Sequence, residues 1–170
     1  MAERRAPKHK RQSLPAVCLD EHIPPRVTEA FKVTFRVIET SHNLKYKGRD
    51  EWAYVNDLYR ENALFVTSDF EHARHIARGR WQHAGVVYIP GSWGVTDKVL
   101  YSQIVTGFVQ EWCRRSRFAL RNHLVYPADE GLHLVRAAKD WLHLSWTRLG
   151  HLVNESPTAL ARRTRKKRRA

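Results

Sequence analysis

Short apolar runs alternate with amphipathic segments between residues 16 and 115, and this alternation constrains the fold more than any other feature. The apolar runs are expected to be strands at 16–19, 35–39, 63–67 and 84–89. Segments with helical spacing of apolar residues follow them, at 25–32, 50–61, 70–78 and 96–115. Strand–helix units repeated in this way favour right-handed crossovers between parallel strands. The sequence therefore predicts an α/β fold with a central, mainly parallel sheet and helices on both of its faces.

Proline and glycine mark several ends of these elements. Pro15 precedes the first strand, and Pro24 or Pro25 suits the first turn of a helix, where the missing N–H is harmless. Gly79 is expected to end the third helix, and Pro90 follows the fourth strand.

The last third of the chain is less regular. Residues 122–126 and 132–135 flank the segment Pro-Ala-Asp-Glu-Gly, which is typical of a hairpin with Asp129 and Glu130 in the turn. Residues 137–153 fit a helix, an irregular segment or a strand, because 141–146 alternates between apolar and polar side chains.

The net charge of +13 is concentrated at the two ends of the chain. Residues 1–11 contain five Lys/Arg and one Glu, and residues 162–169 contain seven Lys/Arg and no acid, which leaves 18 basic against 16 acidic residues elsewhere. The organisation expected is a basic arm at 1–14, one domain at 15–153 and a basic tail at 154–170. Such tails attract polyanions without sequence preference, or are simply solvated.

Other classes of protein are disfavoured by composition. No apolar run approaches the roughly 20 residues of a membrane helix, and no apolar segment follows the basic start of the chain as in a secretory signal. A cytoplasmic protein is therefore expected. Cys18 and Cys113 lie in apolar surroundings and are expected to be buried free thiols.

Carboxylates follow the predicted strands at positions that a parallel sheet would bring together. Asp20 comes after strand 16–19, and Asp69 comes after strand 63–67. Asp50 and Glu51 open the helix before that strand, and Glu71 lies in the helix after it. Functional groups of an open parallel sheet collect at the carboxyl ends of its strands, where the following helices begin. We expect these acids to share one edge.

Clustered carboxylates repel one another, and a divalent cation relieves this repulsion. Hard oxygen ligands suit Mg²⁺ or Mn²⁺, and such a site can bind and hydrolyse a phosphodiester. Each acid also has a structural interpretation. Asp50 and Asp69 suit helix N-caps, and Glu71 suits a first turn, where the helix dipole favours negative charge.

Three motifs resemble those of the PIN-like nuclease superfamily, in the branch that includes VapC-type toxins and small uncharacterised PIN-like proteins. They are Leu-Asp-Glu-His-Ile-Pro-Pro at 19–25, Gly-Arg-Asp-Glu at 48–51 and Leu-Phe-Val-Thr-Ser-Asp-Phe at 64–70. The resemblance covers about residues 16–90, with the order of the motifs preserved. It implies a PIN-like Rossmannoid three-layer α/β/α fold and Mg²⁺- or Mn²⁺-dependent cleavage of RNA, as in the toxin of a toxin–antitoxin pair.

The resemblance also assigns roles to individual residues. Asp20, Asp50 and Asp69 would be the metal ligands, and Thr67 would orient water or a carboxylate. Glu51 would replace Asp50 if that residue is only a cap. The sequence departs from the family pattern at the corner Thr-Ser-Asp-Phe-Glu, because Glu71 stands where a second Asp is expected. The partners implied are RNA, an antitoxin protein and a second copy of the chain, for which helix 96–115 is the first candidate surface.

Basic residues follow Asp69 closely. His72, Arg74, Arg78 and Arg80 are expected to contact RNA phosphates, or to form a solvated helix face. A soft-metal site at His72, His75 and His83 is a minor alternative.

Two other functions stay open. A non-catalytic RNA- or protein-binding module would use the same fold and the basic tails. A phosphoacceptor receiver domain also places acids after its first and third strands, but it needs a Lys at the end of the fifth, and residues 122–126 contain none.

Overall fold

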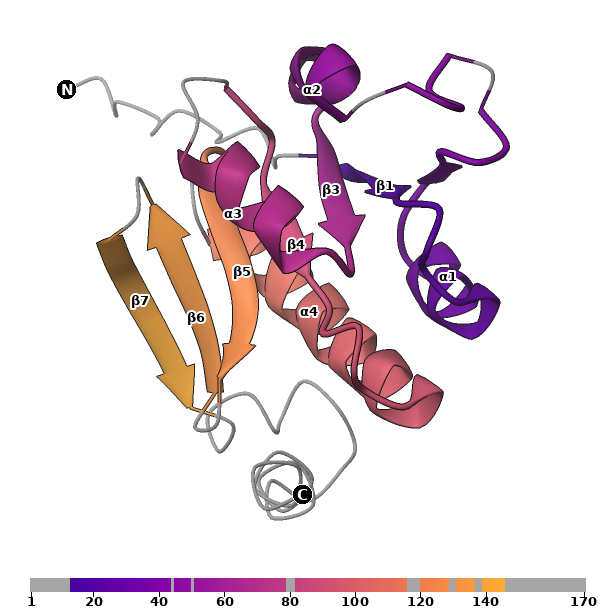
Figure 1. Ribbon diagram of the computed structural model, residues 1–170. Helices are drawn as coiled ribbons and strands as arrows, with labels where there is room; N and C mark the ends of the chain where they lie inside the picture. The colour runs from indigo at the N-terminus through magenta and orange to yellow at the C-terminus, as the bar shows by residue number, and fades with distance from the viewer. Residues whose placement is uncertain are drawn as a thin grey trace, which may run out of the picture.

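The computed structural model of the chain describes residues 13–43, 45–49, 51–78, 82–115, 120–128, 131–136 and 139–145. Its centre is a seven-stranded sheet with the order β2-β1-β3-β4-β5-β6-β7 (Figure 1). The strands are β1 (Ala16–Leu19), β2 (Val37–Glu39), β3 (Ala63–Thr67), β4 (Val86–Tyr88), β5 (His123–Ala128), β6 (Gly131–Arg136) and β7 (Lys139–Ser145). Strands β1 to β5 run parallel to one another, whereas β6 is antiparallel to both β5 and β7.

Helices cover both faces of this sheet, which confirms the predicted three-layer α/β/α arrangement. The helices are α1 (Pro25–Lys32), α2 (Glu51–Arg60), α3 (Phe70–Arg78) and α4 (Val95–Arg115). Helices α1 and α4 pack together on one face, and α2 and α3 lie on the other (Figure 1). The sheet is therefore mainly parallel and buried on both sides in its centre.

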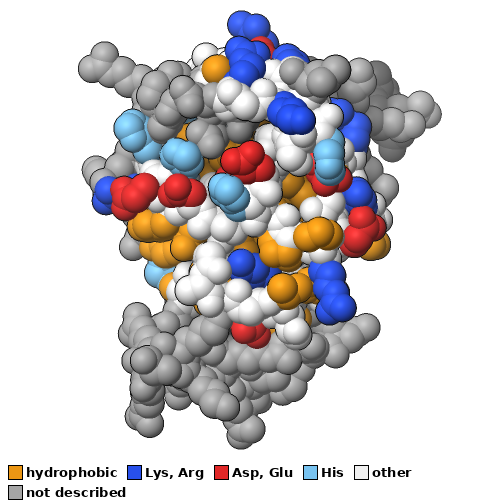
Figure 2. Space-filling model, turned by 45° about the vertical axis from the view of Figure 1, so that its right-hand side comes forward, with side chains coloured by type: hydrophobic (Ala, Val, Ile, Leu, Met, Phe, Trp, Pro, Cys, Tyr) orange, Lys and Arg blue, Asp and Glu red, His pale blue; other side chains and the backbone are white. Residues whose placement is uncertain are grey.

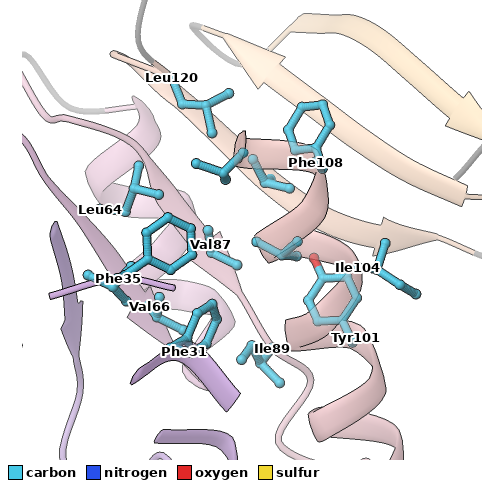
Figure 3. Packing of buried hydrophobic residues seen from close by; sticks show 14 of the residues in the cluster. Phe31, Phe35, Leu64, Val66, Val87, Ile89, Tyr101, Ile104, Phe108 and Leu120 are labelled. Atoms are coloured by element: carbon cyan, nitrogen blue, oxygen red, sulfur yellow. The ribbon is translucent and has the colours of Figure 1, made fainter. Parts of the chain in front are cut away.

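Alternation along the strands divides the core into two clusters. On β3, Leu64 and Val66 face α1 and α4, whereas Phe65 faces α2 and α3. Figure 3 shows the first cluster, where Phe31 of α1 and Tyr101 of α4 approach the strand side chains. Burial of one such side chain contributes about 1.5–3 kcal/mol, so this packing determines which face of the sheet each strand side chain occupies.

Element boundaries agree closely with the sequence predictions for β1, β3, α1 and α3. Two strands are shorter than predicted, since β2 begins at Val37 and β4 spans only Val86–Tyr88. The predicted hairpin is β5–β6, and the ambiguous segment after it forms the strand β7 at 139–145. Predictions for 1–12, Gly79, Asp129 and Glu130, and 146–170 lie outside the described residues.

The position of β1 determines where a site can form. Strand β1 lies between β2 and β3, with Leu19 paired to Val66. The chain therefore moves outward in one direction from β1 to β2 and in the other direction from β3 onward. In sheets with the order 2-1-3-4-5, this reversal leaves a crevice outside the carboxyl ends of β1 and β3.

None of the helices in the described part of the chain has the length and hydrophobicity that crossing a membrane requires. Cys18 and Cys113 are buried free thiols, as predicted.

Candidate functional site

Asp20 and Thr67 meet at the carboxyl ends of β1 and β3. Strand alternation places Asp20 on the same face of the sheet as Cys18, and Thr67 on the same face as Phe65. The Thr67 hydroxyl donates a hydrogen bond of 2.7 Å to the Oδ2 atom of Asp20, and both side chains are buried. The backbone N–H of Glu21 donates to Oδ1 of Asp20 at 2.8 Å. Both carboxylate oxygens are thus held in fixed positions.

Asp69 joins the same group through its backbone. Its N–H donates to the Thr67 hydroxyl oxygen at 3.0 Å, so that oxygen lies between Asp69 and the Asp20 carboxylate. Oδ1 of Asp69 accepts a hydrogen bond of 3.1 Å from the backbone N–H of His72, which is the N-cap interaction considered from the sequence. The Nδ1 atom of His72 lies 3.6 Å from Oδ2 of Asp69. The cap uses one oxygen, and the side chain of Asp69 is still 48% exposed.

Two aromatic residues that the sequence analysis did not single out complete this edge. Tyr88 pairs with Thr67 across β3 and β4, and the Phe70 ring packs edge-on against it with 5.0 Å between ring centroids. Burial raises the pKa of Tyr88, the negative charge of Asp69 raises it further, and a hydrogen bond with the Gly91 backbone acts in the opposite direction. The Tyr88 hydroxyl therefore lies at the same edge as Asp69. Tyr88 lies two residues after Val86, so alternation along β4 predicts both side chains on the face that α2 and α3 cover.

Glu71 does not join Asp20 and Asp69 as an unpaired carboxylate. It is exposed, and it forms an ion pair with Arg74 one turn later in α3. Among the predicted phosphate-binding residues, Arg74 is therefore paired with an acid and His72 is paired with Asp69. The side chain of Arg78, and Arg80 altogether, lie outside the described residues.

Asp50 lies outside the described residues, and Glu51 begins α2 without a described side chain. The segment before α2 runs beside the other end of that helix. The Lys45 ammonium lies 3.3 Å from Asp57 and 3.2 Å from Glu61, and the Tyr46 hydroxyl donates to Glu61 at 3.3 Å. Glu61 precedes β3, at the amino end of that strand. The contribution of Asp50 or Glu51 to the site stays a prediction.

The donor set at this edge is made of hard oxygen atoms. Each oxygen of Asp20 accepts one hydrogen bond and retains a second lone pair. Within the described residues, no three His, Cys, Asp or Glu side chains come close enough together to hold a metal ion. Mg²⁺ is commonly held through one or two carboxylates, with water and substrate phosphate as the other ligands. Asp20 and Asp69 could supply these two carboxylates.

The exposed carboxylates next to the site are paired with basic side chains: Glu21 with His22, Asp69 with His72, and Glu71 with Arg74. Figure 2 shows carboxylate and histidine side chains in a band across the side of the molecule where α1 lies in Figure 1, with hydrophobic side chains exposed below the band. A phosphodiester at this edge would lie close to the carboxylates of Asp20 and Asp69, and a bound cation would offset their repulsion.

Comparisons of the chain with protein-family models, curated proteins and solved structures found no match.

Proposed function

We propose that this protein is a metal-dependent ribonuclease with a PIN-like fold. In this proposal Asp20 and Asp69 bind Mg²⁺ or Mn²⁺, and Asp50 or Glu51 supplies a further carboxylate. The observation that carries the proposal is the hydrogen bond between Thr67 and Asp20 at the reversal of strand order, with Asp69 bonded to the same hydroxyl. This is the position where open α/β sheets bind ligands.

The residues of the chain have separate tasks in this proposal. Thr67 fixes the rotation of the Asp20 carboxylate, so that its unused lone pairs have a constant direction. Asp69 presents a partly exposed carboxylate at the start of α3, where it also caps the helix. A bound Mg²⁺ or Mn²⁺ supplies charge neutralisation at the phosphate and activation of water. Without it, the carboxylates of Asp20 and Asp69 would repel the phosphate.

RNA as the substrate is supported by charge and by resemblance. The basic residues at 1–11 and 162–169 would raise the rate of encounter with a polyanion, and this effect weakens as salt is added. The PIN-like motifs imply RNA in particular. A role as the toxin of a toxin–antitoxin pair, with an antitoxin protein as partner, is a further part of the proposal.

A homodimer is also part of the proposal, but the apolar face of α4, which the sequence indicated for it, is buried inside the protein. The apolar residues of α4 that the sequence indicated, including Leu100, Ile104 and Phe108, are buried against the sheet and α1. A dimer would therefore use another surface.

A non-catalytic RNA- or protein-binding module is the second candidate. It is favoured by the ion pair between Glu71 and Arg74, which occupies the carboxylate where the family pattern has a metal ligand. Titration with Mn²⁺ separates the two functions. The nuclease requires affinity for Mn²⁺ that Asp20→Asn abolishes, whereas the binding module requires none.

A receiver domain is less consistent with the structure. The strand order of β1 to β5 also occurs in receivers. The sequence of β5 is His-Leu-Val-Tyr-Pro-Ala, so the lysine that a receiver needs at the end of this strand is missing.

Cleavage assays on mixed RNAs, with Mg²⁺ or Mn²⁺ and with EDTA, test the proposed activity. We expect cleavage that EDTA stops and that Asp20→Asn and Asp69→Asn each abolish. Glu29→Gln is the matched control, because Glu29 is an exposed carboxylate paired with Lys32 on α1, and its loss should leave cleavage unchanged. Circular dichroism would establish that each variant is folded. Equal cleavage by the wild type and both Asp variants would contradict the proposal.

A further inference from the structure

Lys98 is a buried cation close to the proposed site that no part of the proposed function uses. It lies in the first turn of α4, with 8% of its surface exposed. Its ammonium donates a hydrogen bond of 3.1 Å to the carbonyl of Gly91, which is a neutral group. Lys98 forms no ion pair within the part of the chain that the structure describes.

The surroundings of the Lys98 ammonium suit an anion. Burial of an ammonium costs free energy unless a counter-charge and hydrogen bonds compensate for lost hydration. The amino end of the 21-residue helix α4 adds partial positive charge from the helix dipole, and Asp97 in the same turn offsets part of it. An anion bound beside Lys98 would supply the counter-charge that the Gly91 carbonyl does not.

Lys98 reaches the same edge of the sheet as Asp20 and Asp69. The Cβ atom of a residue larger than glycine at position 91 would lie 3.4 Å from the Ser68 carbonyl oxygen, so Gly91 packs against the residue between Thr67 and Asp69. The same glycine therefore contacts Lys98 and the strand end that carries Asp69.

The loop between β4 and α4 leaves room for a ligand. Gly91, Ser92 and Gly94 are exposed, and a Cβ atom added at Gly94 would meet only Asp97, at 3.9 Å. The first N–H groups of a helix lack partners within the helix and suit the oxygen atoms of a phosphate. The lysine, the helix end and the small residues together favour this anion.

We propose that Lys98 and the amino end of α4 bind a phosphate group of the RNA strand, next to the phosphate that Asp20 and Asp69 would address through a cation. Lys98 is then a binding residue that sets the register of the strand on the protein. The inference rests on the proposed function for the identity of the ligand as RNA. The preference for an anion rests on Lys98 and α4, independently of that function.

The test is RNA binding by the full chain as a function of salt. Lys98→Met keeps the aliphatic part of the side chain and removes the charge, and Lys98→Gln is a second neutral variant in case the first does not fold. Anisotropy of a labelled, unstructured RNA oligonucleotide in EDTA gives the affinity without cleavage. We expect several-fold weaker binding at low salt and a slope of log K against log salt concentration that is smaller by about 0.7, the value for one phosphate contact on a single strand.

Lys47→Met is the matched control, because Lys47 is an exposed lysine in the segment before α2. It should leave the slope unchanged, and Lys98→Arg should keep the wild-type slope. A wild-type slope in both neutral variants of Lys98 would overturn the inference, whatever the nuclease assay gives. If Lys98 only holds the loop at Gly91, the neutral variants would instead lower the urea midpoint and retain the wild-type slope. A smaller slope in the neutral Lys98 variants, together with a wild type that does not cleave RNA, would support the phosphate site and contradict the nuclease.

Discussion

The hydroxyl of Thr67 and the carboxylate of Asp20 are joined by a hydrogen bond of 2.7 Å between residues 47 positions apart. The bond exists because β1 and β3 are parallel neighbours, and because both side chains fall on the face that α2 and α3 cover. The same hydroxyl accepts the N–H of Asp69. Thr67 therefore connects the two carboxylates that the proposed function requires, and it is the first position to test.

Thr67→Val should remove both hydrogen bonds with almost no change in shape. A hydrogen bond to a charged group contributes about 1.5–3 kcal/mol, so we expect a loss of this size in the free energy of unfolding in urea. Cleavage should also fall, because Asp20 would no longer be held by its Oδ2 atom. Thr67→Ser keeps the hydroxyl and should retain most of both properties. A Val variant as stable and active as the Ser variant would show that this bond is unimportant.

His83 should make the fold sensitive to mild acid. Burial lowers the pKa of His83 to about 4, and the neighbouring His123 contributes in the same direction. The unfolded chain binds a proton at this position near pH 6.5 and the folded chain does not, so stability falls as the pH decreases from about 6.5 to 4. The difference amounts to about 2–3 kcal/mol at pH 4.5.

Urea unfolding between pH 7.5 and 4.5 measures this loss. His83→Phe should reduce the dependence of stability on pH by the amount attributed to His83. The control is Asn122→Ala, which removes the side-chain acceptor for the His83 backbone N–H and should destabilise the fold about equally at every pH. Parallel pH curves for the wild type and His83→Phe would exclude this role of His83.

Gly85 should tolerate no side chain. Its φ angle is +130°, and an added Cβ atom would lie 2.7 Å from Leu64 Cδ2 and 2.9 Å from the carbonyl of Leu120. Gly85→Ala combines backbone strain with this overlap, so a destabilisation of about 1–3 kcal/mol or more is expected. Gly94→Ala is the control, because its Cβ atom would meet open space apart from Asp97. Equal urea midpoints for the two variants would refute the argument.

The thiol of Cys18 should report global unfolding. Burial raises the pKa of Cys18 to about 12, and the charges of Asp20 and Glu61 act in the same direction. Only the thiolate reacts with alkylating reagents, so labelling at pH 8.5 should require opening of the sheet and should accelerate with urea. Ser92→Cys provides an exposed thiol as the comparison, and it should react at once. Rapid labelling of Cys18 in the native protein would mean that β1 opens locally.

The sequence predicted β1 and β3 to the residue, because both are short apolar runs with clear ends. All residues of both strands are buried in the centre of the sheet, so the apolar run and the strand coincide. The segment 137–153 could not be assigned, because its alternation is short and pairing with β6 decides the outcome. Lys98 could have been found from the sequence. It precedes the buried Val105 by two helical turns, which places it on the inner face of α4.

The site was predicted only as far as the strands determine it. Asp20 and Asp69 follow directly from β1 and β3, and alternation along the strands places Thr67 between them. The position of Asp50 depends on the path of the long segment after β2, which local capping signals do not determine. Glu71 can either pair with Arg74 or bind a metal, and its side-chain rotamer decides between these two roles. The spacing of the residues in the sequence does not predict which rotamer forms.

Binding of Mn²⁺ to the wild type and to Asp20→Asn, measured by calorimetry beside RNA cleavage in the same buffer, tests the central claim most directly. The account predicts one Mn²⁺ site in the wild type, loss of that site in Asp20→Asn, and loss of cleavage in the same variant. Glu29→Gln should behave as the wild type in both measurements. Cleavage by Asp20→Asn at the wild-type rate, or a wild type that cleaves RNA equally well in EDTA, would contradict it.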